Sequence, residues 1–131
     1  MKGYHTNIEQ ETADNQDFRR VLYTGDYTQL VLMSLEPSQS IGLETHGNDQ
    51  FFRFESGSGT VEIDGEEYSV RDGDCVIVPA GAKHNVTNAS TVDALKLYTL
   101  YSPPHHMDGT VHKTKSEADA SHEAFDGTAT E

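Results

Sequence analysis

The sequence predicts an all-β fold, either a two-sheet sandwich or a closed barrel, followed by one short helix. Between Phe18 and Tyr101, short apolar or alternating runs are separated by Gly, Asp, Asn and Pro. These breaks recur about every 8 to 12 residues, which is typical of many short strands. No helical period interrupts this stretch. Each short strand must bury one face against another sheet, and a sandwich or a closed barrel achieves that.

The strands are expected where the runs lie between breaks. The Asp64-Gly65 pair separates two alternating runs, and it favours a type I′ hairpin turn because both central residues of that turn need a positive φ. Gly-rich turns are also expected at 56–59 and 71–74, and Pro79 ends a strand. The expected strands are 18–23, 27–36, 41–46, 50–55, 59–64, 66–71, 74–78, 84–88 and 93–101.

The length of 131 residues allows one domain. Pro103 and Pro104 cannot continue a strand ladder, so the barrel should end before them. Thr114 and Glu117 form a capping box that predicts a helix over 115–124. The final polar residues are expected to fray. The predicted organisation is an N-terminal segment 1–17, a β-barrel 18–102, a loop and short helix 103–124, and a tail 125–131.

The charge balance excludes some partners. Nine Lys and Arg against 22 Asp and Glu give a formal net charge of −13, and the four Arg form no cluster that would bind phosphates. No apolar run approaches the roughly 20 residues of a membrane span, and the N-terminus lacks an apolar signal region. We therefore expect a cytoplasmic protein that binds neither nucleic acid nor membrane. The acidic excess fits either a solubilising surface or a high-salt habitat.

One spacing pattern stands out in the second half of the chain. Gly73, Pro79, Gly81, His84 and Asn88 follow one another as G-x5-P-x-G-x2-H-x3-N. The pattern resembles the second conserved motif of the cupin superfamily, in which the Gly and Pro residues shape turns and the His binds a metal. The resemblance implies a double-stranded β-helix, the jelly-roll barrel of the cupins, with His84 as a metal ligand.

An earlier stretch resembles the first cupin motif, H-x-H-x3-E-x6-G, in part. Glu44 stands in the place of the first His, His46 in that of the second, and Gln50 in that of the Glu. Gly57 falls on its expected place, whereas Ser38 occupies the position of an earlier Gly. These departures leave open which residues bind the metal, but they do not change how the motif aligns with the sequence.

Strand geometry supports the same set of ligands. Residues two apart on a strand face one way, so Glu44 and His46 share a side, and Gln50, Phe52 and Phe54 share a side of the next strand. Together with a second imidazole, these groups form an N/O set that suits one divalent transition ion such as Zn, Mn, Fe or Ni. Phe52 and Phe54 are expected in the core and at the pocket wall.

A competing register is disfavoured. It would take His46 as the first ligand and Asn48 as the second, which places Phe52 where the carboxylate belongs and leaves no anionic ligand. The histidines outside both motifs are expected at the surface or in other satisfied positions; these are His5, His105, His106 and His122. Cys75 is expected as a buried core thiol.

A further resemblance concerns about residues 18–120. The segments 96–98, 102–105 and 109–115 look like the tail of a group of small cupins labelled as similar to mannose-6-phosphate isomerase. This implies a metal-dependent isomerase, although the same barrel serves many functions. An Fe(II) dioxygenase and a non-catalytic binding protein stay open as alternatives. The scarcity of cations disfavours phosphorylated substrates and favours an unphosphorylated sugar or another small oxygen-rich molecule.

A proton-transfer enzyme also needs a general base. By position alone, the candidates are His112, Lys96 and Tyr98. The family resemblance and the exposed edges of an open barrel further predict a homodimer.

Overall fold

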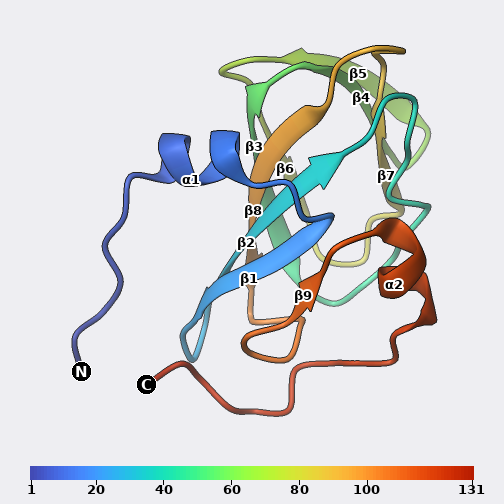
Figure 1. Ribbon diagram of the computed structural model, residues 1–131. Coiled ribbons are helices and arrows are strands. Elements are labelled where there is room, and N and C mark those ends of the chain that lie inside the picture. Colours follow the sequence, from blue (N-terminus) through green and yellow to red (C-terminus); the bar gives the residue numbers. More distant parts are fainter.

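The computed structural model describes residues 1–131, and it shows two antiparallel sheets facing each other (Figure 1). This confirms the all-β jelly-roll class with a short C-terminal helix. The strands are β1 Arg19–Thr24, β2 Gln29–Leu35, β3 Asp49–Ser56, β4 Ser58–Ile63, β5 Glu66–Arg71, β6 Cys75–Val78, β7 His84–Asn88, β8 Leu95–Ser102 and β9 Val111–His112. The helices are α1 Ile8–Asp14 and α2 Lys115–Ala120.

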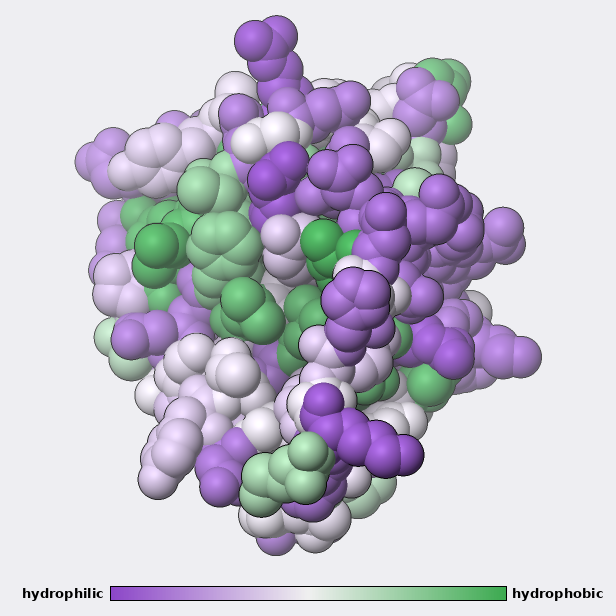
Figure 2. Space-filling view, turned by 90° about the vertical axis from the view of Figure 1, so that its left-hand side faces the viewer, coloured by the Kyte–Doolittle hydropathy of each residue, from purple (hydrophilic) through white to green (hydrophobic).

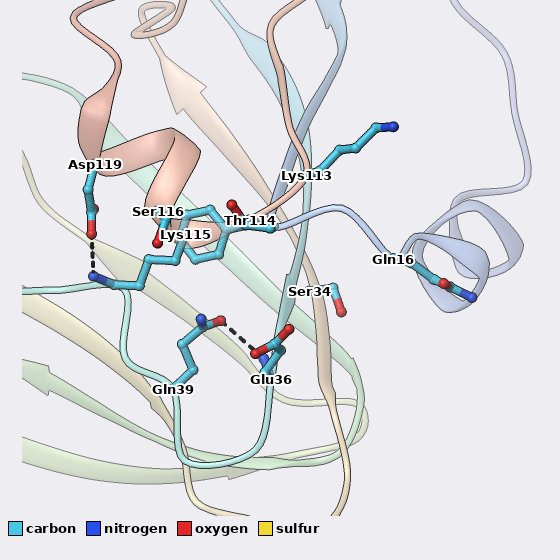
Figure 3. A pocket seen from close by; sticks show the side chains of 10 residues that line it. Gln16, Ser34, Glu36, Gln39, Lys113, Thr114, Lys115, Ser116 and Asp119 are labelled. Carbon is cyan, nitrogen blue, oxygen red and sulfur yellow. Dashed lines mark hydrogen bonds and ion pairs between the residues drawn. The ribbon is translucent and has the colours of Figure 1, made fainter.

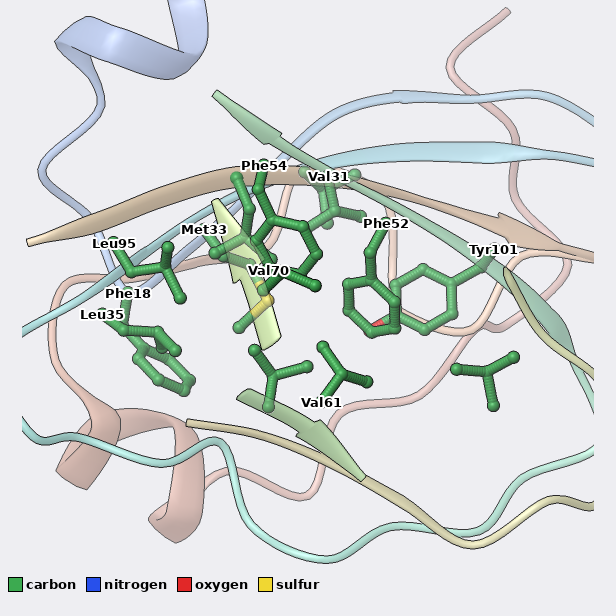
Figure 4. Close-up of a cluster of buried hydrophobic side chains, with 14 of the residues drawn as sticks. Phe18, Val31, Met33, Leu35, Phe52, Phe54, Val61, Val70, Leu95 and Tyr101 are labelled. Atoms are coloured by element: carbon green, nitrogen blue, oxygen red, sulfur yellow. The ribbon is translucent and has the colours of Figure 1, made fainter. Parts of the chain in front are cut away.

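The larger sheet has six strands in the order β6-β3-β8-β2-β1-β9, and the smaller has three in the order β5-β4-β7. Strand β8 lies inside the larger sheet, where it pairs with β2 and β3. Alternate residues of β8 point inward, in accord with the period of two. Leu95 and Leu97 enter the apolar core that both sheets enclose, which Figure 4 shows together with Phe52 and Phe54.

The outer face of the larger sheet also carries apolar side chains. Strand register places Phe51 between Ile77 of β6 and Leu100 of β8. Phe51 alternates with the buried Gln50 and Phe52, so it points away from the core. Figure 2 shows a face of the molecule on which apolar side chains gather in a patch bordered by polar ones.

One expected strand does not form. Around the segment 41–46, only isolated bridges to β7 form, at Ser40 and Glu44. Gly42 lies between these bridges with a φ of 112°, and that conformation interrupts an extended strand. The other expected strands are present within a few residues of their predicted bounds.

Two short elements were not predicted, namely α1 and β9. Asn7 caps α1 by accepting a hydrogen bond from the Gln10 N–H at 3.0 Å. The only buried residue of this helix is Thr12, so an apolar periodicity that would have revealed the helix is absent. Neither α1 nor α2 is long and apolar enough to cross a membrane.

The C-terminal region is more ordered than expected. Thr114 caps α2 by accepting from the Glu117 N–H at 3.1 Å, but the helix ends at Ala120 rather than at 124. The tail 125–131 makes hydrogen bonds to the rest of the chain. Its Phe125 N–H donates to the His105 carbonyl at 3.0 Å, and its Thr130 N–H donates to the Thr24 carbonyl at 2.8 Å.

The predicted hairpin between β4 and β5 is confirmed. Asp64 has a φ of 46° and Gly65 a φ of 87°, so both central residues are left-handed, as a type I′ turn requires. Ile63 and Glu66 pair directly across this two-residue loop. Cys75, in contrast, is an exposed free thiol rather than a core residue, because it begins the edge strand β6.

Gly57 should be intolerant of a side chain. Its φ is 109°, and an added Cβ would lie 2.8 Å from the carbonyl oxygen of Ala94. We expect Gly57→Ala to lower the free energy of unfolding by at least about 1–3 kcal/mol, the usual cost of such backbone strain. Urea denaturation measures this. The control is Gly47→Ala, where a Cβ meets no atom within 4 Å. Equal stability of the two variants would contradict the clash.

Candidate metal centre

Three side chains converge at one end of the barrel. Glu44, His46 and His84 each offer one ligand atom, and these atoms lie within 4.8 Å of one another. The Glu44 and His84 backbones hold the group together, since each N–H donates to the other's carbonyl at 2.9 Å. His46 follows Glu44 by two residues, and its ring lies 4.9 Å from that of His84 between centroids. The structure therefore brings together the imidazoles and the carboxylate of both motifs.

Gln50 approaches the group from β3. Its side chain points inward and is only 2% exposed. The amide Nε2 donates to Thr99 Oγ1 at 3.0 Å, which orients the amide. The amide oxygen Oε1 is buried and has no hydrogen-bond partner. An amide held in this way presents an unused acceptor to the interior.

The unpaired polar atoms of this region are all potential ligand atoms. Both ring nitrogens of His46, Nε2 of His84 and Oε1 of Gln50 are buried without a partner. Buried polar atoms are rarely left unpaired, because each one costs about 1–3 kcal/mol. His84 Nδ1 lies 3.0 Å from the Ala82 carbonyl, so it donates there and leaves Nε2 as a lone pair. This backbone contact is the orientation typical of metal-binding imidazoles.

The protonation of His46 also suits a metal ligand. Burial is the main cause that lowers its pKa, and the neighbouring His84 lowers it further. Glu44 opposes this shift but does not reverse it. His46 therefore stays neutral at physiological pH, and a neutral imidazole can coordinate a metal.

The phenylalanines lie where the alternation of β3 puts them. Phe52 is buried, and its ring centroid is 6.3 Å from that of His84, so it walls the group on the core side. Phe54 stacks on Phe52 from deeper in the core, with centroids also 6.3 Å apart. Asn48, which belonged to the competing register, instead donates to the Pro103 carbonyl at 2.6 Å.

His106 is one of the satisfied histidines that were expected, since both of its ring nitrogens are hydrogen-bonded, whereas His105 lies half-buried beside the metal group. The ring of His105 is 4.8 Å from that of His46, and the pKa of His105 falls to about 4, chiefly through burial. His106 is buried. By contrast, His5 and His122 are exposed, as predicted.

A single buried amide explains this difference. The Gln29 side chain accepts from the N–H groups of His105 and His106 at 3.1 and 2.9 Å. Its Nε2 donates to the His106 carbonyl at 2.8 Å and to Thr24 Oγ1 at 2.9 Å. Three of these hydrogen bonds hold the loop after β8 inward, and the fourth anchors the amide to Thr24. The two histidines belong to no spacing motif. The sequence indicates their place only in that they follow β8, the strand that pairs with Gln50 of β3.

The three candidate bases do not join the group. Lys96 and Tyr98 alternate with the inward residues of β8, so they lie on its outer face. There Lys96 Nζ donates to Ser34 Oγ at 2.9 Å, and Tyr98 packs near Phe51. His112 is buried, but its Nδ1 lies 3.2 Å from Nη1 of Arg19 on the neighbouring strand.

A separate cavity of about 480 Å³ lies beside α2 (Figure 3). Polar side chains line it, among them Glu36, Gln39 and Lys113. Lys115 also lines it but is paired with Asp119 at 2.9 Å. None of the converging ligand groups borders this cavity, so it is distinct from the candidate metal centre.

Comparison with known proteins places this geometry in a family. The chain is 44% identical over 124 residues to the uncharacterized protein YrkC of Bacillus subtilis, covering 89% of this chain and 66% of YrkC. It is 41% identical to the uncharacterized protein L612 of Acanthamoeba polyphaga mimivirus, covering 82% of this chain and 70% of L612. The chain thus spans about two thirds of the length of these curated relatives.

A solved structure agrees with the fold. BH2720 from Bacillus halodurans superposes with a TM-score of 0.89 at 43% identity, covering 92% of this chain and 96% of that one. The family model described as "Cupin domain" matches residues 31–101, which include Glu44, His46, Gln50 and His84. The chain belongs to the cupin domain family.

Proposed function

We propose that this cupin binds one divalent transition-metal ion through Glu44, His46, Gln50 and His84, and that the ion holds a small oxygen-rich molecule. One observation carries the proposal. Ligand atoms from three residues lie within 4.8 Å of one another, and the buried nitrogen and oxygen atoms around them lack protein partners. A cation would satisfy one nitrogen of each imidazole together with the carboxylate and the amide oxygen.

The set of donors limits the choice of metal. Two imidazoles, one carboxylate and one amide oxygen suit Zn, Mn, Fe or Ni, which accept mixed N/O ligands. When bound, the ion would act as a Lewis acid toward an oxygen of the ligand. The chain itself orients the donors, since Ala82 fixes the ring of His84 and Thr99 fixes the amide of Gln50. Phe52 shields the core side of the site from water.

For the ligand we propose an unphosphorylated sugar or a similar hydroxyl-bearing molecule, with an isomerase-like reaction. The resemblance to mannose-6-phosphate isomerase-like cupins supports this proposal. The side chains beside the metal group are imidazole, phenol and amide groups, which hydrogen-bond hydroxyl and carbonyl oxygens. NMR of the metal-loaded protein with a panel of aldoses and ketoses separates the alternatives. Interconversion supports an isomerase, and saturable binding without turnover supports a binding protein.

Self-association is also proposed. The exposed Ile77 lies on the edge strand β6 beside Phe51, and these apolar side chains on the outer sheet face support a homodimer.

The metal itself is the first test. Elemental analysis of protein purified without added metal or a metal-affinity step should find about one divalent transition ion per chain. His84→Ala should remove the ion, because it deletes one imidazole of the converging group. The exposed His122→Ala is the matched control and should retain the ion. A metal-free parent, or equal metal in both variants, would contradict the proposed centre.

The role of Gln50 is tested by a change of charge. Gln50→Glu replaces a neutral amide oxygen by a carboxylate, so we expect divalent metal to bind at least about tenfold more tightly, a gain of about 1.4 kcal/mol. Competition with a chelating dye measures the affinity. The control Gln39→Glu adds the same charge in the separate cavity, and it should leave the affinity for divalent metal unchanged. If Gln50→Glu binds metal no better than the parent, Gln50 does not coordinate it.

Stability should depend on metal and on pH. A ligand that binds only the folded state at a hundredfold excess over Kd adds about 2.7 kcal/mol, so a chelator should lower Tm by roughly 5–20 °C at pH 8. Protons compete for imidazoles, so this difference should shrink as pH falls below about 6.5. Because the pKa of His46 is lowered, the pH at which half of the Tm difference is lost should lie below about 6.5. Overlapping melting curves at pH 8 would show that no tightly bound metal stabilises the fold.

A further inference from the structure

A buried hydrogen-bonded chain runs from the C-terminal segment to the metal group. Glu123 Oε1 lies 2.6 Å from His106 Nδ1, and His106 Nε2 lies 3.3 Å from the Tyr101 hydroxyl. Tyr101 is 2% exposed and His106 6%, and the Glu123 side chain is 12% exposed. The metal ligands do not require this chain, and neither motif in the sequence indicates it.

The protons in this chain have a fixed direction. Burial alone would raise the pKa of Glu123, but hydrogen bonds from His106 and from the Met107 N–H outweigh it and hold the pKa at about 2. The ionised carboxylate can only accept, so Nδ1 of His106 donates to it. In the tautomer that carries its hydrogen on Nδ1, Nε2 is an acceptor, and the Tyr101 hydroxyl donates to it. The Tyr101 oxygen is left to accept a hydrogen bond.

Tyr101 stands beside the candidate metal centre. It is the direct cross-strand partner of Gln50. The ring of Tyr101 is 5.8 Å from that of His46, and His105 stacks on it at 5.2 Å with an interplanar angle of 22°. Figure 4 shows the phenol pointing into the barrel toward Phe52. The oxygen of Tyr101 is therefore a directed acceptor inside the same end of the barrel as the metal group.

We propose that Tyr101 contacts the ligand in the metal site and accepts a hydrogen bond from a ligand hydroxyl, with His106 and Glu123 as positioning residues. The ligand class is a small molecule that carries a hydroxyl next to a carbonyl or carboxylate group. This inference rests on the proposed metal-binding function and narrows its ligand. A molecule with a carbonyl in place of the hydroxyl gives the Tyr101 oxygen no donor.

The proposal gives the C-terminal segment a role in the site. Glu123 follows α2 and is held by the Met107 N–H at 2.8 Å. Two residues later, the Phe125 N–H donates to the carbonyl of His105. The segment thus fixes the loop that carries both histidines, and the site is incomplete without it.

Lactate and pyruvate provide matched probes, because they share a carboxylate and a three-carbon skeleton and differ in hydroxyl against carbonyl. Each is titrated at pH 8 into the full chain loaded with Co²⁺, and binding is followed by the visible Co²⁺ spectrum and by calorimetry. We expect the parent to prefer lactate. Tyr101→Phe should weaken lactate binding by about 2- to 10-fold, the range for one neutral hydrogen bond, and leave pyruvate binding unchanged.

The positioning residues are tested by the ratio of the lactate and pyruvate affinities. Glu123→Gln keeps the size of the side chain but removes the charge that fixes the direction of the protons, so it should reduce the lactate preference while Co²⁺ affinity stays the same. The control is Glu117→Gln, which removes a carboxylate at the start of α2, outside the chain. Its lactate preference should equal that of the parent. Melting curves establish that each variant is folded.

The outcomes separate this inference from the proposed function. A parent that binds no Co²⁺ overturns the metal centre and the inference with it. A parent that binds Co²⁺ but shows no preference for lactate, or binds neither acid, overturns the inference alone. An unchanged preference in Tyr101→Phe does the same.

Discussion

The candidate site depends on one backbone pairing, the isolated bridge between Glu44 and His84. Two hydrogen bonds of 2.9 Å hold the irregular segment before β3 against the first residue of β7. His46 follows Glu44 by two residues in the same segment, and its ring lies 4.9 Å from that of His84 between centroids. Without the bridge, the carboxylate and both imidazoles would have no common position, and the polar end of the barrel would lack its organising contact.

Strand β8 divides the interior into two halves. Its inward residues are aliphatic at Leu95 and Leu97, while Thr99 and Tyr101 carry hydroxyl groups and the ring of Tyr101 still belongs to the core. The apolar half packs the sheets together by burial of hydrophobic surface, which provides most of the stability. The polar half orients the side chains of the site, since Thr99 holds Gln50 and Tyr101 reaches His106. Substitutions along one strand therefore affect either stability or the site, according to their place.

At the polar end of the barrel, some buried polar groups have hydrogen-bond partners and others have none. Gln29 makes four hydrogen bonds, and His106 is bonded through both ring nitrogens. The unpaired atoms gather at His46, Gln50 and His84. A few lie elsewhere: Arg53 Nε and Glu55 Oε1 face each other at 3.4 Å as an ion pair, and Arg19 bonds His112 through Nη1 while its Nε stays unpaired. Most unpaired buried atoms of the barrel therefore belong to residues of the candidate metal centre, where an unpaired polar atom is costly.

The sequence by itself determined most of the strands and the type I′ turn, because alternation and φ preference are local properties. Its spacing motifs also named Glu44, His46 and His84, but the bridge between Glu44 and His84 is what brings them together. Only the tertiary structure decided where loop residues point. The half-buried position of His105 depends on a hydrogen bond to Gln29, which is 76 residues away along the chain. The outward position of Lys96 follows from which face of β8 meets the smaller sheet. Glu123 reaches His106 because the segment after α2 folds back over the barrel, and no local pattern encodes such long-range contacts.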